Sequence, residues 1–384
     1  MFRELQKHPM FVFLMVLTIA SAVGLQAWRT LFNNFAVEIA KLDGFHIGMI
    51  QSFREIPGFL ALLAVYILKI LKEHHLSALS VVTLGLGVMI TGLFPSYYGL
   101  LITTLIMSYG FHYFETTNQS LTLQYFDKTR SPWIFGKLRS YAALSNIGVG
   151  AVIYIITAYL SYKEIYLLIG SLIVLAGLWG FRSDPSEKHL PAQHKRMILK
   201  KQYWLFYLLT FLAGARRQIF VAFAVFLLVK IFQFSIREIT VLFVINNIIN
   251  FILMPLIGKV IIKFGERRLL SIEYFSLVFI FTAYAYVEVK WIIGMLYILD
   301  QILFNFAIAI RTYFQKIGDP KDIAPTMAVG FTINHIAAVV LPAVGGIVWM
   351  IDYRIPFLAG AGLSVISLIA VQKIPALKKV REEV

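Results

Sequence analysis

Long uninterrupted runs of apolar residues constrain this chain more than any other feature. Several segments of roughly 20 residues carry few or no charges, and a helix of that length spans the ~30 Å hydrocarbon core of a bilayer. The sequence of 384 residues is 59% hydrophobic and only 14% charged. We therefore expect an all-α membrane protein, because a β-barrel would instead show short segments of alternating hydrophobicity.

Hydropathy and helix-breaking residues predict twelve transmembrane helices. They are expected near 10–40, 46–71, 76–95, 97–124, 138–160, 164–182, 202–231, 237–263, 269–287, 291–315, 326–350 and 355–372. The longest connection is polar and basic, and it divides the helices into six plus six. We expect an N-terminal six-helix bundle at 1–182, a cytoplasmic linker at 183–201 and a C-terminal six-helix bundle at 202–384.

The distribution of positive charge predicts the orientation in the membrane. The net charge is +15, and in a membrane protein such a surplus marks cytoplasmic loops rather than a nucleic-acid partner. Most lysines and arginines fall in loops on the side that also holds both termini. We therefore expect both termini in the cytoplasm, with the plasma membrane, as a bacterial inner membrane, as the location. There is no cysteine, which excludes disulfides and thiolate metal sites.

The two halves carry traces of an internal repeat. A shift of 188 residues, the separation of Arg29 and Arg217, lays AWRTLFNNFAV over ARRQIFVAFAV with six of eleven positions identical. The same shift pairs Asn146 with Asn334 and places Asp300 opposite His112. Repeats of this kind are typical of secondary transporters, whose sites lie near the interface of the two repeats.

One loop carries the most specific resemblance to a known family. The stretch GKVIIKFGERRLL resembles the loop between helices 8 and 9 of the major facilitator superfamily, with Gly258, Gly265, Arg267 and Arg268 matched and Ile262 in place of the usual Asp. The resemblance covers nearly the whole chain. It implies two pseudo-symmetric six-helix bundles that alternate access to a central site, lined mostly by helices 1, 4, 7 and 10. It also implies a monomer that needs no cofactor.

Arginines on helices 1 and 7 are the first candidates for solute contact. Gln26, Arg29 and Asn33 share one face of the first helix, and Arg217 is the repeat mate of Arg29. A charge in mid-membrane normally faces a cavity or a partner, and the planar guanidinium fits carboxylate or phosphate. This placement is similar to that of organophosphate:phosphate antiporters. The alternative is an internal ion pair of Arg29 with Glu55.

The remaining arginines of the apolar segments are expected to have other roles. Arg54 and Arg216 are interpreted as structural, and Arg311 as reaching the headgroups or the cytoplasm. Among the histidines, His74 and His75 are expected to be solvated residues of a cytoplasmic loop.

A polar stripe on the fourth helix is the candidate proton pathway. Ser108, His112, Glu115 and Gln119 follow one another at spacings of four, three and four. Glu115 lies one turn from His112, so the two predict a proton relay, and Gln119 is a candidate solute contact. The alternative for Glu115 is a salt bridge with an arginine.

The tenth helix offers a second polar cluster. Asp300 is a further proton-coupling candidate and Asn305 a further solute contact. A metal site of His112, Glu115 and His335 is an alternative, since these residue types suit zinc or similar ions. We expect no metal, because nothing in the sequence requires helix 11 to bring His335 to helix 4.

These observations predict a secondary active transporter for a small anionic solute, with a proton as a coupling ion. The sequence contains no nucleotide-binding Gly-Lys loop and no nucleophile elbow, so neither ATP-driven transport nor enzymatic activity is expected. The main alternative is proton-driven efflux of amphipathic drugs or other hydrophobic compounds, which the aromatic content and the acidic residues Glu115 and Asp300 would serve. A second alternative is a receptor or assembly factor of this fold without net transport.

Overall fold

The structure is a computed structural model that describes residues 7–42, 44–187, 190–191, 193–194, 196–234 and 236–375. Throughout these ranges the regular structure is helical. Both ends of the chain, on which part of the predicted orientation rests, lie outside the described residues.

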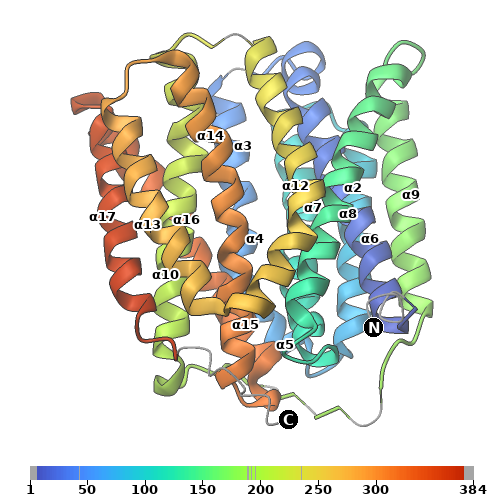
Figure 1. Cartoon of the computed structure of the whole chain (residues 1–384). Coiled ribbons are helices and arrows are strands. Elements are labelled where there is room, and N and C mark those ends of the chain that lie inside the picture. The colour runs from blue at the N-terminus through green and yellow to red at the C-terminus, as the bar shows by residue number, and fades with distance from the viewer. Residues whose placement is uncertain are drawn as a thin grey trace. The chain divides into compact units, whose positions relative to one another are not determined.

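The helices of the first half form six consecutive segments (Figure 1). They are α2 (Pro9–Asn34) with the π-helical η1 (Phe35–Ile39); the interrupted segment of α3 (Gly44–Arg54), α4 (Ile56–Phe59), η2 (Leu60–Leu63) and α5 (Ala64–Ile67); α6 (Glu73–Thr91); α7 (Tyr97–Tyr125); α8 (Ser131–Ile156); and α9 (Tyr162–Arg182).

Six more segments follow in the second half. They are η3 (Lys201–Tyr203), α10 (Trp204–Ile219), the π-helical η4 (Phe220–Ala224) and α11 (Val225–Lys230); α12 (Ile236–Phe264); α13 (Glu266–Tyr286); α14 (Lys290–Phe304), η5 (Asn305–Ala307) and α15 (Ile308–Ile317); η6 (Pro320–Asp322) and α16 (Ile323–Ile351); and α17 (Arg354–Val371).

Within the described residues these segments confirm the twelve predicted helices. Ten of them are long and apolar enough to span a membrane, and α7 and α16 have 29 residues each. Short capped connections separate them. Ser161 forms a capping box with Glu164 at the start of α9, and Gly265 adopts φ 79° between α12 and α13, where a residue with a Cβ would be strained.

The start of α6 corrects one expectation. His74 is buried, with 3% of its surface exposed, and it lies in α6, which begins at Glu73 rather than in the predicted range 76–95. The expectation that His74 is solvated is therefore wrong. Its Nε2 lies 3.6 Å from Asp184 Oδ1. Hydrogen bonds from Ser186 lower the pKa of Asp184 below its usual value, so this carboxylate stays ionised beside the imidazole.

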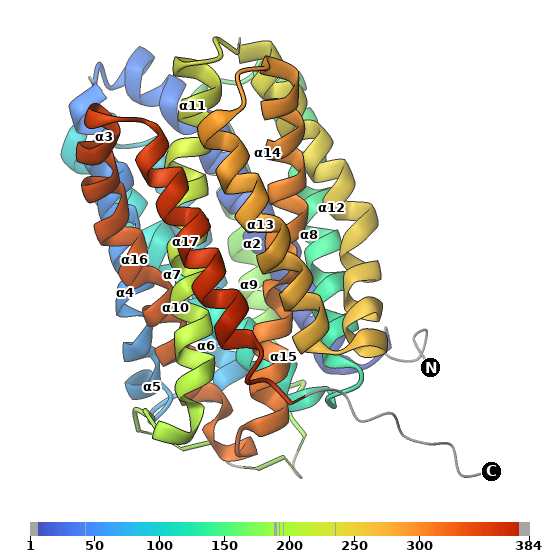
Figure 2. The same ribbon diagram turned by 60° about the vertical axis from the view of Figure 1, so that its left-hand side comes forward.

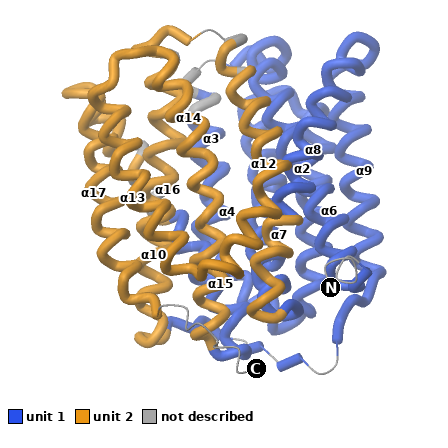
Figure 3. Tube along the Cα trace, viewed as in Figure 1, with its two compact units in different colours: residues 1–126, 138–199, 319–335 blue, residues 127–137, 200–318, 336–384 orange. Residues whose placement is uncertain are grey.

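The chain divides into two compact units by contacts (Figure 3). Unit 1 holds residues 1–126, 138–199 and 319–335, and unit 2 holds 127–137, 200–318 and 336–384. Most of each unit coincides with one half of the sequence. The exceptions are two short segments, 127–137 and 319–335, that belong to the unit formed mainly by the other half.

In unit 1, small residues allow α6 to lie close to its neighbours. α6 packs against both α7 and α9. A Cβ on Gly110 of α7 would overlap the backbone of Leu84, and one on Gly170 of α9 would overlap Met89. Glycines at such crossings let helix backbones approach, which is how helices associate in a medium as apolar as their own side chains.

The segment 319–335 belongs to unit 1 because it completes the interrupted segment of α3 to α5. Thr332 on α16 accepts a hydrogen bond from the Leu62 amide at 3.0 Å and donates one to the Phe59 carbonyl at 2.9 Å. Backbone groups freed by a helix break need such partners in a membrane. Pro57 and Gly58, in the short α4, mark the break.

In unit 2, α13 packs along α17, as Figures 1 and 2 both show, and α10 also contacts α17. The start of α8 joins this unit through two glycines. A Cβ on Gly136 would overlap the carbonyl of Met254, and one on Gly258 would overlap that of Pro132. The segment 127–137 is therefore held against α12.

Candidate functional site

The polar stripe predicted on the fourth helix lies on α7 and is largely buried. Ser108, His112 and Gln119 are 0%, 4% and 6% exposed. Glu115 lies at the edge of the stripe, where its Oε2 accepts a hydrogen bond from Arg139 Nη2 of α8 at 3.0 Å. Glu115 therefore has an arginine partner, which is the alternative that the sequence left open.

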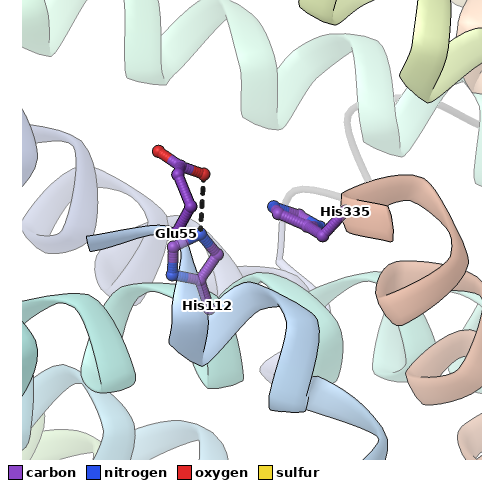
Figure 4. Close-up of side chains that lie close together, drawn as sticks. All are labelled: Glu55, His112 and His335. Atoms are coloured by element: carbon purple, nitrogen blue, oxygen red, sulfur yellow. Dashed lines mark ion pairs between the residues drawn. The ribbon is translucent and has the colours of Figure 1, made fainter. Parts of the chain in front are cut away.

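His112 faces Glu55 of the interrupted segment (Figure 4). The distance from His112 Nε2 to Glu55 Oε2 is 4.0 Å. The other oxygen, Oε1, accepts hydrogen bonds from Arg54 Nη2 at 2.6 Å and Nε at 3.2 Å. Arg54 also lies over the ring of Trp28, 5.5 Å from its centroid. Glu55 is thus oriented by the neighbouring arginine, whereas the sequence considered it as a partner for Arg29.

A third side chain, His335 of α16, completes this cluster within unit 1. Glu55, His112 and His335 each present one ligand atom, and these atoms lie within 4.8 Å of one another. The rings of His112 and His335 meet edge to face, with centroids 5.1 Å apart. Figure 4 shows the three side chains converging from separate helical elements.

Glycine at position 58 leaves room for the two imidazoles. A Cβ there would lie 2.7 Å from His335 Nε2 and 2.8 Å from His112 Cδ2. Such distances are below van der Waals contact, so alanine would displace the rings. Gly58, in the short α4, therefore makes space for the cluster.

Hydrogen bonds set the tautomers of both histidines. His112 Nδ1 lies 2.9 Å from the Ser108 carbonyl and 2.9 Å from Ser108 Oγ, whose own hydrogen is donated to the Arg54 carbonyl. His335 Nδ1 lies 2.8 Å from the Phe331 carbonyl. Because a carbonyl oxygen only accepts, each Nδ1 carries a hydrogen, and each neutral ring offers its lone pair at Nε2.

The predicted solute contacts of the first helix lie on α2 in unit 1. Arg29 and Asn33 are exposed, while Gln26 is partly buried and donates to Thr30 Oγ1 at 3.3 Å. Directly beyond them the helix changes to the π-helical η1. π-Helical turns inside α-helices frequently occur at functional sites.

The adjacent arginines of α10, in unit 2, have opposite environments. Arg216 is fully buried, its Nη1 donates to Ser367 Oγ, and its guanidinium lies 4.3 Å from the centroid of the Tyr274 ring. Its Nη2 is 3.9 Å from Glu273 Oε1. Arg217 is exposed, and the π-helical η4 begins three residues later. These contacts agree with a structural Arg216.

The predicted cluster of the tenth helix is spread along α14 and η5. Asp300 is completely buried, and neither carboxylate oxygen has a hydrogen-bond partner among the described residues. Asn305 starts the 3-10 turn η5 and donates to Asn250 Oδ1 at 2.7 Å. An intramembrane carboxyl group without a hydrogen bond is a default candidate for function.

Sequence reasoning missed Glu55 as a neighbour of His112, and it considered His335 beside His112 only in the metal site that it did not expect. A signal for this site was present, since the charged pair Arg54-Glu55 directly precedes Pro57-Gly58 inside an apolar segment. Discontinuous helices interrupted by Gly or Pro mark binding sites in many transporters. Arg139 was missed because nothing local shows that α8 brings it to Glu115.

Comparisons with known proteins agree with this architecture. The model of the Major Facilitator Superfamily matches residues 10–342. A search of curated proteins found no match.

Several solved structures share the fold at low identity. The fucose:proton symporter FucP of E. coli matches with TM-score 0.73 and 14% identity, over 96% of this chain and 98% of that chain. The human organic anion transporter TETRAN matches with TM-score 0.73 and 12% identity, over 95% of this chain and 99% of that chain. A bacterial homologue of the iron transporter ferroportin matches with TM-score 0.76 and 12% identity, over 95% of this chain and 98% of that chain.

The family assignment follows from the match over most of the chain. The multi-pass helical structure fits a secondary transporter and not an enzyme. The chain belongs to the Major Facilitator Superfamily.

Proposed function

We propose that this transporter moves a small anionic solute through a bacterial inner membrane by alternating access, as a monomer with both termini in the cytoplasm. Residues 1–182 and 202–384 would supply the two moving bundles and 183–201 the linker between them. Arg29 and Arg217 would contact the anion, with Gln26, Asn33, Gln119 and Asn305 as further polar contacts.

One observation carries this proposal. Arg29 and Arg217 occupy equivalent positions of the repeat, both are exposed, and both precede a π-helical turn in their helix. Arg216, next to Arg217, is instead buried against protein groups. An exposed, permanently charged guanidinium fork is suited to carboxylate or phosphate.

Uptake into proteoliposomes tests the solute class. Purified protein is reconstituted and offered labelled carboxylates, phosphate esters and inorganic anions, with cationic drugs as the competing class. We expect uptake of one anion class, reduced at least tenfold in Arg29→Gln and in Arg217→Gln. Arg130→Gln is the matched control, since the side chain of Arg130 is 42% exposed and pairs with Asp127.

Two results would count against the anion proposal. Transport of cationic drugs with no anion flux would favour the efflux alternative. Anion flux that both arginine variants retain would make these arginines structural.

Proton coupling is the second part of the proposal. Asp300 is supported by its complete burial without a hydrogen-bond partner among the described residues. His112 and Glu115 would relay protons in unit 1, where His112 also faces Glu55.

A further inference from the structure

We infer that Glu55, His112 and His335 form a binding site for a divalent first-row transition-metal ion. The residues belong to one unit but to three separate segments: Glu55 lies between α3 and α4, His112 on α7 and His335 on α16. This inference does not depend on the anionic solute proposed above. It also departs from the expectation of no metal, because Glu55 takes the place that the sequence considered for Glu115.

The separation of the ligand atoms suits a shared ion. They lie within 4.8 Å of one another, and His112 Nε2 and Glu55 Oε2 are 4.0 Å apart. Ligands at 2.0–2.2 Å from one zinc-like ion are roughly 3–4 Å from each other. The observed spacing is therefore only slightly wider than the spacing around a shared ion, and side-chain rotations would have to close the difference (Figure 4).

The hydrogen bonds around the cluster leave one lone-pair atom of each side chain available as a ligand. His112 and His335 each hold Nδ1 against the carbonyl of the residue four positions earlier, at 2.9 and 2.8 Å, which leaves Nε2 as the ligand atom. Arg54 holds Oε1 of Glu55 at 2.6 Å and leaves Oε2 toward His112. Partners of this kind orient ligands and set their basicity in metal sites.

The ligand types select the class of ion. Imidazole nitrogen suits Zn²⁺, Fe²⁺, Co²⁺ and Ni²⁺, whereas Mg²⁺ and Ca²⁺ prefer oxygen ligands. Two histidines and one carboxylate leave coordination positions open for water or a solute oxygen. An ion held in this way can be exchanged. The competing outcome of the test is a cluster that binds no ion and in which Glu55 forms an ion pair with His112 when that imidazole is protonated.

Direct binding to the purified protein tests the inference. The protein is prepared without a histidine tag, stripped with chelator, and titrated calorimetrically with ZnCl₂ and CoCl₂, with MgCl₂ as the comparison. The visible absorption of bound Co²⁺ reports nitrogen ligation. We expect one Zn²⁺ or Co²⁺ per chain, a Co²⁺ spectrum with nitrogen ligands, and no competition from an excess of Mg²⁺.

Variants locate the ion. Glu55→Gln and His335→Asn are expected to weaken Zn²⁺ binding by more than the roughly 10–100-fold that a lost outer-shell contact costs. His46→Gln and Glu115→Gln are matched controls, since His46 packs on Tyr97 and Glu115 pairs with Arg139. Both should bind Zn²⁺ within about twofold of the parent, because neither supplies a ligand.

Clear results would overturn the inference. They are the absence of stoichiometric Zn²⁺ and Co²⁺ binding, binding that Mg²⁺ displaces, or binding that survives both Glu55→Gln and His335→Asn. Thermal unfolding of each variant confirms that it is folded, and His335→Asn alters only a half-buried side chain. Failure here would leave the anion flux experiment untouched, since that experiment tests other residues.

Discussion

The charged side chain of Arg216 is completely buried within unit 2. Its guanidinium is 0% exposed and is compensated by Glu273, the hydroxyl of Ser367 and the face of Tyr274. Removing one partner of a buried pair costs more than the pair contributes, because the remaining charge is left in a medium of low polarity. Arg217, one residue later, is exposed instead.

Arg216→Gln should therefore destabilise the protein by about 3–5 kcal/mol, the cost of an uncompensated buried charge. Thermal unfolding in detergent measures this loss. Arg217→Gln is the control and should change the melting temperature little. The double variant Arg216→Leu with Glu273→Leu should recover part of the lost stability, since it removes both charges of the pair. Equal stability of the two single glutamine variants would contradict this interpretation.

Asp300 is the buried carboxyl group on which we base a second residue-scale prediction. Asparagine has nearly the same shape but cannot take up and release a proton, so Asp300→Asn should stop accumulation driven by a pH gradient. Exchange of the solute down its own gradient should continue. Both rates are measured in proteoliposomes, with Asp352→Asn, a change at the start of the α17 segment, as control. Unchanged pH-driven accumulation would exclude Asp300 as the coupling group.

At the scale of elements, the interrupted segment of α3 to α5 is the feature that builds the cluster. A continuous helix through 44–67 would carry its hydrogen bonds internally, but α3 ends at Arg54 and is followed by the short α4, which holds Pro57 and Gly58, and then by η2. Thr332 then bonds to both Phe59 and Leu62 of the break. The same contact sets α16 beside this segment, and His335 lies one turn beyond Thr332.

Thr332→Val keeps the shape of the side chain and removes both hydrogen bonds. Each backbone group left unsatisfied costs about 1–3 kcal/mol, so a lower melting temperature is expected, together with weaker Zn²⁺ binding. Thr282→Val is a matched control, because among the described residues the hydroxyl of Thr282 donates to the carbonyl four residues earlier in its own helix. If the two valine variants behaved alike, the contact of Thr332 with the break would have no special role.

For the whole molecule, the absence of cysteine makes the proposed orientation directly testable. Met197 lies in the connection between the two halves and Tyr159 in the connection between α8 and α9, and both side chains are exposed. With the termini in the cytoplasm, these connections face opposite sides. Met197→Cys should react with a membrane-impermeant maleimide only in inverted vesicles, and Tyr159→Cys in intact cells. The opposite pattern would reverse the orientation.

The sequence by itself determined the membrane class, the number of spanning segments and the family. These depend on the lengths of apolar runs and on one loop motif, which are local properties. It also identified His112 and the stripe of α7, because residues three and four apart share a helix face. The helix starts were predicted less closely, as α6 shows, because the polar residues at its start extend the helix without changing the apolar run.

Only the tertiary structure decided which partners these residues have. It paired Glu115 with Arg139 and turned His112 toward Glu55. It enclosed Arg216 and left Arg217 exposed. It also joined 319–335 to the unit of the interrupted segment. Such outcomes depend on the rotation of each helix about its axis and on glycine contacts between helices distant in sequence, and no local pattern contains either.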